Sequence, residues 1–210
     1  MAKFDNAIPY IKKAEGGLSR AITDSASKNP APFTYNGKTG WHTNKGITYE
    51  TFKYMASKVG YAANADNFFK MPDSIWLGIY KKGYWDEVKG DLYNSQALAN
   101  AIVDYAWAFG VGGARTRISK YLLDKYKVST KNFTEIANAF NTLTKESDKQ
   151  VFNDFIEHRK NAFKALKQPA NEKGWINRMD TLSRDSLKLL YDSASETVAK
   201  VTDEVKKNPC

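Results

Sequence analysis

Residues 4–17, FDNAIPYIKKAEGG, predict a short helix that ends at a carboxylate. Three apolar side chains recur at helical spacing in this segment and give it one apolar face. Asp5 is expected to cap its start, and the two glycines are expected to end it by entering the left-handed region. Glu15 would then lie at the negative end of the helix dipole, which favours a protonated carboxyl group and raises its pKa. Such a group can act as a general acid, although an ordinary solvated helix end explains the same residues.

The length and composition are those of one globular domain. The chain has 210 residues, of which 42% are hydrophobic and 13% aromatic, enough for a sizeable core. The longest apolar stretch, residues 97–110, is interrupted by Asn100 and Asp104, so we expect no transmembrane segment. The N-terminus has no apolar h-region, and we therefore expect a protein made in the cytoplasm without a signal peptide.

Cysteine and histidine are too rare for a metal or disulfide framework. The single cysteine, Cys210, excludes an intramolecular disulfide and argues against a cysteine zinc site. The two histidines, His42 and His158, lie far apart in the chain. We therefore expect no metal and no cofactor.

The net charge predicts a polyanionic partner. There are 32 Lys and Arg residues against 23 Asp and Glu residues, which gives +9. The lysines are scattered, and no nucleic-acid-binding motif is visible, so we expect no nucleic-acid partner. Attraction to an anionic cell wall or envelope surface fits the charge, as does ordinary solubility.

Apolar spacing predicts a bundle of helices after one early hairpin. Asn36-Gly37, inside residues 33–39, supplies the two positive-φ residues of a type I′ turn. Asn94 or Ser95 is expected to cap the best-patterned helix, and Gly110 to end it. The predicted helices lie near residues 48–58, 73–82, 95–109, 113–126, 132–142, 146–167 and 174–194.

A constellation of polar residues follows the first helix. Asp24 lies in the next loop, and Thr43 opens the sequence TNKGIT at residues 43–48. A helix ending in Glu-Gly-Gly, then an Asp, then Thr-x-x-Gly-Ile-Thr resembles glycoside hydrolase family 108, the N-acetylmuramidases of phages and bacteria. It is also similar to the active-site layout of phage-type lysozymes. Three later segments extend the resemblance to about residue 180: GYWD at 83–86, VDYAWAFG at 103–110 and KGWINR at 173–178.

The resemblance implies a mainly α, lysozyme-like helical domain with a small β-hairpin after the first helix. Residues 1–110 would form the catalytic region and residues 111–194 a helical C-terminal part of the same compact domain. Residues 195–210 are expected to be an amphipathic or flexible tail. Two segments differ from the family: the stretch between Asp24 and Thr43 is longer, and VSTKN at 128–132 stands where the family often carries Asp-Gly-x-x-Gly in a peptidoglycan-binding subdomain.

The implied activity is cleavage of the β-1,4 bond between N-acetylmuramic acid and N-acetylglucosamine in peptidoglycan. Such chemistry uses two carboxyl groups. Glu15 would be the general acid, Asp24 the second carboxylate, and Thr43 would hold a water. A loop turn explains Asp24 equally well, and a strand edge explains Thr43. The expected substrate-binding residues are Trp41, His42, Tyr84, Trp107 and Arg178, although packing in the hairpin or core explains the aromatic ones too.

Two other functions remain open. If Asp24 does not reach the site, Glu15 alone would give 1,6-anhydro products, as in lytic transglycosylases. A non-catalytic module that binds the wall or nucleic acid is the second alternative. We expect a monomer that reaches the wall through a holin, lysis or specialised secretion. One pairing is also expected: Asp104, on an apolar helix, should find Arg178 or Arg159.

Overall fold

Helices dominate the described part of the chain, as the apolar spacing predicts. The computed structural model describes residues 1–22 and 33–207, with the backbone alone for residues 14 and 190–207. The helices are α1 (Phe4–Ala14), α2 (Tyr49–Met55), α3 (Ala65–Phe69), α4 (Asp73–Tyr80), α5 (Gln96–Tyr126), α6 (Phe133–Lys164) and α7 (Pro169–Lys207). Two 3-10 turns, η2 (Ser57–Val59) and η4 (Gly90–Leu92), and one π-helical turn, η3 (Lys81–Trp85), lie between them. The mainly α fold class is confirmed.

Internal contacts divide the chain into two compact units. The helical unit joins residues 1–10 to residues 88–210, and the hairpin unit comprises residues 11–87. Helix α1 passes from one unit to the other, so that Glu15, directly after it, belongs to the hairpin unit. The functional boundaries predicted near residues 110 and 194 stay predictions.

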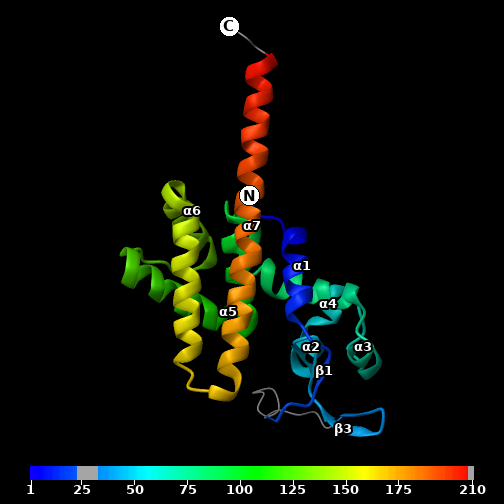
Figure 1. Cartoon of the computed structure of the whole chain (residues 1–210). Coiled ribbons are helices and arrows are strands. Elements are labelled where there is room, and N and C mark those ends of the chain that lie inside the picture. The colour runs from blue at the N-terminus through cyan, green and yellow to red at the C-terminus, as the bar shows by residue number, and fades with distance from the viewer. Residues whose placement is uncertain (23–32, 208–210) are drawn as a thin grey trace. The chain divides into compact units, whose positions relative to one another are not determined.

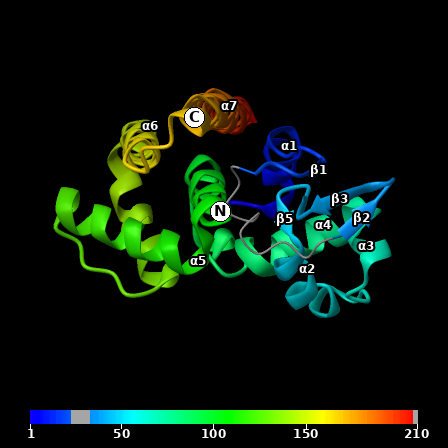
Figure 2. The same ribbon diagram turned by 90° about the horizontal axis from the view of Figure 1, so that it is seen from below.

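The helical unit is built on α5, α6 and α7, which lie side by side (Figures 1 and 2). The first part of α5 is buried throughout residues 97–106. Its predicted start is confirmed, because the Ser95 hydroxyl accepts a hydrogen bond of 3.3 Å from the Leu98 amide. Its predicted end is confirmed as well, since Gly110 breaks the helical backbone with φ 71° and ψ 157°, a conformation that favours glycine. Helix α6 breaks likewise at Ser147.

A buried ion-pair network holds α5, α6 and α7 together. The Asp104 carboxylate accepts hydrogen bonds from Arg159 Nη2 at 2.5 Å and from Arg178 Nη2 at 2.6 Å. Asp104 is 8% exposed and Arg159 is 0% exposed. Burial alone would raise the pKa of Asp104, but the charges of Arg178 and Arg159 outweigh it and hold the pKa below its usual value. The expected partner for Asp104 is therefore confirmed, with both arginines engaged.

The imidazole of His158 makes the helical unit sensitive to acid. Burial, assisted by the charge of Arg159, lowers its pKa from 6.5 to about 4. Between these values the unfolded chain binds a proton that the folded chain does not, so stability is complete above pH 6.5 and declines as the pH falls towards 4. We expect a loss of roughly 1–2 kcal/mol, discounted for the partial exposure of the ring. Urea unfolding at several pH values measures it.

The matched variant for this prediction is His158→Phe, because phenylalanine fills a similar aromatic site and does not titrate. Its free energy of unfolding should change less than that of the wild type between pH 6.5 and 4. Parallel pH profiles for the two proteins would contradict the assignment to His158.

The hairpin unit contains two small antiparallel sheets. Strands β2 (Phe33–Tyr35) and β3 (Lys38–Trp41) pair across Asn36-Gly37, whose φ values of 51° and 70° confirm the predicted type I′ turn. Strands β1 (Leu18–Ser19), β4 (Thr43–Asn44) and β5 (Ile47–Thr48) form the second sheet in the order β1-β4-β5. This second sheet was not predicted, because strands of two residues show no apolar alternation.

Aromatic packing fixes the strands against the helices of the same unit. The Phe33 and Tyr49 ring centroids are 4.1 Å apart, and Tyr35 stacks on Phe69 at 4.6 Å. The Asn44 amide donates a 2.6 Å hydrogen bond to the Phe68 carbonyl, so β4 is held by α3. These contacts give β4 a defined position for the residue beside Asn44, which is Thr43.

Three expectations about helix ends are wrong. Helix α1 begins at Phe4, so Asp5 lies in its first turn and does not cap it. Neither Gly16 nor Gly17 has a positive φ, because the chain runs from α1 directly into extended β1. Helix α7 begins at Pro169, where proline is favoured because a first-turn residue needs no amide donor. Within the described ranges, no helix is long and apolar enough to cross a membrane.

Candidate active site

Glu15 lies at the junction between α1 and the three-stranded sheet. Helix α1 ends at Ala14, and β1 begins three residues after Glu15, at Leu18. The Glu15 side chain is half-buried, whereas Gly16 and Gly17 are exposed. The carboxyl group is thus partly withdrawn from water on a segment anchored at both ends. Glu15 was expected on the last turn of the helix and instead follows it, because α1 ends at Ala14, and its role as the general acid stays a prediction.

Backbone pairing brings Thr43 alongside the segment that follows Glu15. Strand β1 pairs antiparallel with β4, which sets Ser19 opposite Thr43. The His42 amide donates to the Ser19 carbonyl at 3.3 Å, and the Lys45 amide donates to the Gly17 carbonyl at 3.2 Å. The segment leading from Glu15 and the strand that carries Thr43 therefore form one hydrogen-bonded ladder.

The Thr43 hydroxyl is suited to hold a water or a substrate oxygen. The residue is 7% exposed, and its Oγ1 atom has no hydrogen-bond partner within the described part of the chain. A buried hydroxyl in this state loses its bonds to solvent on folding and regains them only from a bound molecule. A strand position also favours threonine, so the role of this hydroxyl in holding a water stays a prediction.

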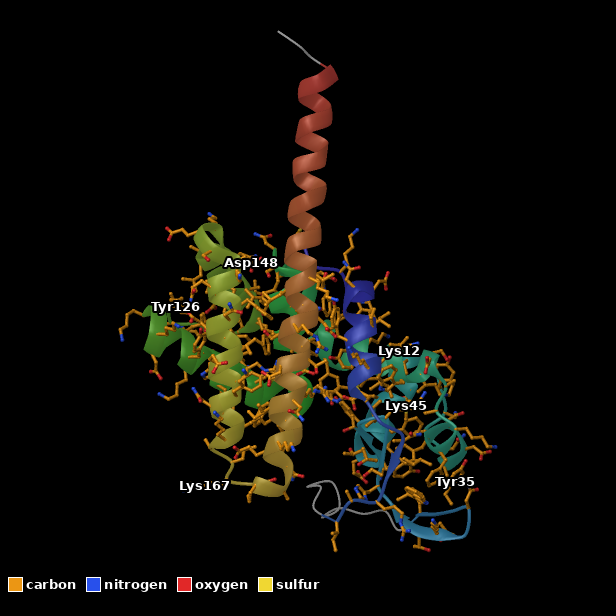
Figure 3. The ribbon with its side chains drawn as sticks, viewed as in Figure 1. Lys12, Tyr35, Lys45, Tyr126, Asp148 and Lys167 are labelled. Carbon is orange, nitrogen blue, oxygen red and sulfur yellow. The ribbon has the colours of Figure 1, made fainter. Side chains whose placement is uncertain are left out.

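An ion-pair cluster fixes the elements around Glu15. Lys12, in the last turn of α1, and Lys45, in the β4–β5 turn, are labelled in Figure 3. Both bind the Asp73 carboxylate, at 2.6 and 2.9 Å. Hydrogen bonds from Lys12 and then Lys45 lower the pKa of Asp73 to about 2. Asp73 opens α4, so one carboxylate links three elements of the hairpin unit. This cluster could not be predicted from the sequence, since its members lie far apart in the chain.

Tyr84 lies within electrostatic reach of Glu15. Burial raises the pKa of its phenol, and the negative charge of Glu15 raises it further. The residue is half-buried in the π-helical turn η3, with its ring 5.9 Å from that of Tyr80. Single π-helical turns are frequent at functional sites. Tyr84 thus stays protonated and presents an O–H group near the proposed acid.

Trp41 and His42 make contacts inside the hairpin unit. The Trp41 indole donates to the Tyr35 carbonyl at 3.2 Å, and the Arg20 guanidinium lies 5.5 Å from the centre of its ring. His42 is buried, with Nδ1 3.2 Å from the Gly40 carbonyl. These contacts are those of hairpin packing, and a sugar-binding role for either residue stays a prediction.

Two other predicted site residues belong to the helical unit, and one lies outside the described residues. Trp107, half-buried on α5, and Arg178, bound to Asp104, belong to the helical unit. Asp24 lies outside the described residues, so its role as the second carboxylate stays a prediction. In the hairpin unit, Glu50, Asp66 and Asp86 each pair with a lysine, as surface carboxylates commonly do. Among the described side chains, which lie within residues 1–22 and 33–189, no three or more His, Cys, Asp and Glu residues form a group that could hold a metal ion.

Comparison with known proteins finds a matching family model and a solved structure with a similar fold. The family model described as Glycosyl hydrolase 108 matches residues 8–110. The structure of Brucella abortus SagA is similar with a TM-score of 0.63 and 20% sequence identity, over 88% of this chain and 94% of that chain. At this identity the similarity shows the fold alone. A search of curated proteins finds no match.

Proposed function

Residues 8–110 of this chain belong to the glycosyl hydrolase 108 family, and from this premise we propose that the protein is a peptidoglycan hydrolase. It cleaves the β-1,4 bond between N-acetylmuramic acid and N-acetylglucosamine, as an endolysin or autolysin-like muramidase. The observation that carries the proposal is the half-buried Glu15 carboxyl group. It lies just before strand β1, which pairs with β4, the strand that contains Thr43.

Glu15 acts as the general acid in this proposal. It protonates the glycosidic oxygen as the bond to the anomeric carbon breaks and positive charge develops on the sugar ring. Asp24 supplies the second carboxylate, which stabilises that charge or activates a water. The phenol of Tyr84 donates a hydrogen bond that holds the Glu15 carboxylate after proton transfer. Trp41, His42, Trp107 and Arg178 are proposed to contact the sugar chain.

Thr43 positions the attacking water in this proposal. Thr43→Val is expected to leave the thermal midpoint unchanged or slightly raised, because the lost hydroxyl has no protein partner among the described residues. Release of peptidoglycan fragments should fall about tenfold to a hundredfold, since a displaced water loses its reactive geometry. Calorimetry and a turbidity assay on the same preparation measure both quantities. If Thr43→Val released fragments at the wild-type rate, the Thr43 hydroxyl would have no role in the mechanism.

The basic surface fits the proposed substrate. With a net charge of +9, the chain is attracted to anionic bacterial envelopes, and this raises its local concentration at the wall. We propose that the protein acts there as a monomer after release from the cytoplasm by a holin, by lysis or by specialised secretion.

The position of the cut tests the proposal. Purified peptidoglycan is digested with the full chain, reduced with borohydride, and separated by liquid chromatography with mass spectrometry. We expect fragments that end in reduced N-acetylmuramic acid, and fragments that end in reduced N-acetylglucosamine would contradict the proposed bond. Ends in the 1,6-anhydro form, which resist reduction, would indicate transglycosylation. Binding to the wall without any release of fragments would support a non-catalytic module.

A further inference from the structure

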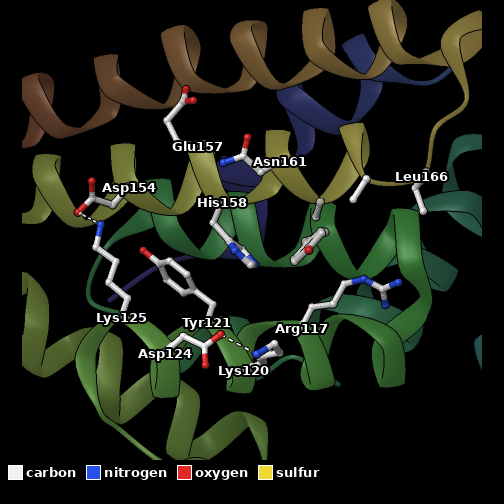
Figure 4. Close-up of a pocket in the computed structure, with 13 residues that line it drawn as sticks. Arg117, Lys120, Tyr121, Asp124, Lys125, Asp154, Glu157, His158, Asn161 and Leu166 are labelled. Atoms are coloured by element: carbon white, nitrogen blue, oxygen red, sulfur yellow. Dashed lines mark hydrogen bonds and ion pairs between the residues drawn. The ribbon is translucent and has the colours of Figure 1, made fainter.

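The helical unit contains a pocket that the proposed reaction does not use. It has a volume of about 650 Å³ and lies between α5 and the second part of α6 (Figure 4). Pockets that bind small molecules commonly have this volume. Tyr105 and Tyr121 form its buried wall, and the small side chains of Ala162 and Ala165 leave space beside them.

Each acidic side chain of the pocket lining pairs with a lysine. Asp124 pairs with Lys120 at 2.8 Å, and Asp154 pairs with Lys125 at 2.5 Å, as the dashed lines in Figure 4 mark. Glu157, the third acid of the lining, pairs with Lys160 at 2.8 Å. Arg117 is a further cation of the lining, and it forms no ion pair with a carboxylate of the described residues. Lys160 also binds Asp180, at 2.9 Å, and the lining itself carries three carboxylates and three cations, so its charge is balanced. Arg117 is the cation that an anionic ligand can bind without breaking an ion pair among the described residues.

Arg117 is held in place before any ligand arrives. Its Nη1 atom donates to the Gly113 carbonyl at 3.2 Å, and its guanidinium carbon lies 4.3 Å from the centre of the Phe109 ring. A cation–π contact of this kind restricts the guanidinium and leaves its remaining N–H groups available. The planar set of donors matches the two oxygens of a carboxylate.

A buried hydroxyl group of the same pocket also has no bond to the protein. Tyr105 is 0% exposed and lines the pocket, and its hydroxyl has no hydrogen-bond partner among the side chains that the structure describes, which end at residue 189. The Arg159 guanidinium, 5.1 Å from the ring centre, and the edge-on ring of Phe155 hold the Tyr105 ring in position. An unpaired hydroxyl buried at this depth is unfavourable unless a ligand or water bonds to it.

The imidazole of His158 completes the wall. Its ring lies 4.4 Å from that of Tyr121, and Figure 4 shows it extending from α6 towards α5. The Nε2 atom is buried and has no hydrogen-bond partner in the described part of the chain. Arg117, Tyr105 and His158 therefore line a space with aromatic and small apolar walls, and the Arg117 guanidinium forms no ion pair with a carboxylate of the described residues.

We propose that this pocket is a binding site for a small carboxylate with an aromatic or apolar body. Arg117 and the Tyr105 hydroxyl bind the carboxylate, and the rings of Tyr121 and His158 cover the body. The site is separate from Glu15, in sequence and in the unit that carries it. It makes the C-terminal helices a ligand-binding part of the protein.

Benzoate is the probe, and benzamide, which has the same shape without the charge, is the matched control. Both are titrated into the full chain labelled with ¹⁵N, and amide shifts in α5 and α6 report binding. We expect benzoate to bind saturably and benzamide to bind at least about tenfold more weakly, since a hydrogen bond to a charged group contributes that much. Equal binding of the two probes, or no shift in these helices with benzoate, would overturn the proposal.

Two variants separate ligand binding from packing. Tyr105→Phe keeps the ring, and Arg117→Gln keeps a similar length without the charge. Each should weaken benzoate binding about tenfold or more, while Tyr105→Phe leaves the thermal midpoint unchanged or raises it, because the hydroxyl has no protein partner in the described residues. If both folded variants bind benzoate as the wild type does, the assigned donors are wrong.

Discussion

Glu15→Gln is expected to abolish fragment release from peptidoglycan, with a loss on the order of a hundredfold or more in rate. Glutamine matches the shape of the acid but cannot deliver a proton, so the leaving oxygen must depart without protonation. The variant should fold as the wild type does, because Glu15 is only half-buried and lies outside the regular part of α1. Initial rates on purified peptidoglycan, with circular dichroism of the same samples, measure both effects.

The control for this variant is Glu50→Gln. Glu50 belongs to the same hairpin unit, is exposed, and pairs with Lys53 at 2.6 Å. Losing one surface ion pair changes stability little, and we expect activity equal to that of the wild type. If Glu15→Gln and Glu50→Gln both retain full activity, Glu15 is not the acid.

Asp104→Ala is expected to lower the free energy of unfolding by about 3–5 kcal/mol, the usual effect of leaving buried cations without their counter-ion. Arg159 is 0% exposed, and its Nη2 atom bonds to Asp104. Removal of the carboxylate leaves the charge of Arg159 buried and removes two hydrogen bonds from Arg178. Urea unfolding followed by circular dichroism measures the change.

Asp124→Ala provides the matched control on the same helix. Asp124 pairs with Lys120 at 2.8 Å, but both side chains are more than half exposed, at 57% and 75%. We expect a change of about 0.5 kcal/mol or less. If Asp104→Ala and Asp124→Ala lowered the free energy of unfolding equally, burial of the Asp104 network would contribute nothing to stability.

Local rules predicted the helices and one turn from sequence alone. Gly110 and Ser95 mark the ends of a segment whose apolar spacing is regular, and Asn36-Gly37 supplies the backbone that a tight hairpin needs. A partner for Asp104 could be predicted, because Asp104 is a charged residue on an apolar helix and an isolated buried charge is unfavourable. Each of these inferences uses residues that are close in sequence or a rule about burial.

Contacts between distant residues were beyond sequence reasoning. The pairing of Ser19 with Thr43 depends on a strand of two residues, too short for a periodic signal. The cluster at Asp73 joins lysines that come from elements 28 and 61 residues away. A ligand-binding role for the Tyr105 hydroxyl could not be predicted from the sequence, because a tyrosine on an apolar helix face resembles any other core residue.

Hydrolysis by Glu15 is tested most directly by digesting purified peptidoglycan in H₂¹⁸O and analysing the products by mass spectrometry. We predict that the wild-type chain releases fragments carrying one ¹⁸O at the reducing end of N-acetylmuramic acid, and that Glu15→Gln releases almost none. Unlabelled 1,6-anhydro fragments from the wild type, or labelled fragments from Glu15→Gln at the wild-type rate, would contradict the proposed mechanism.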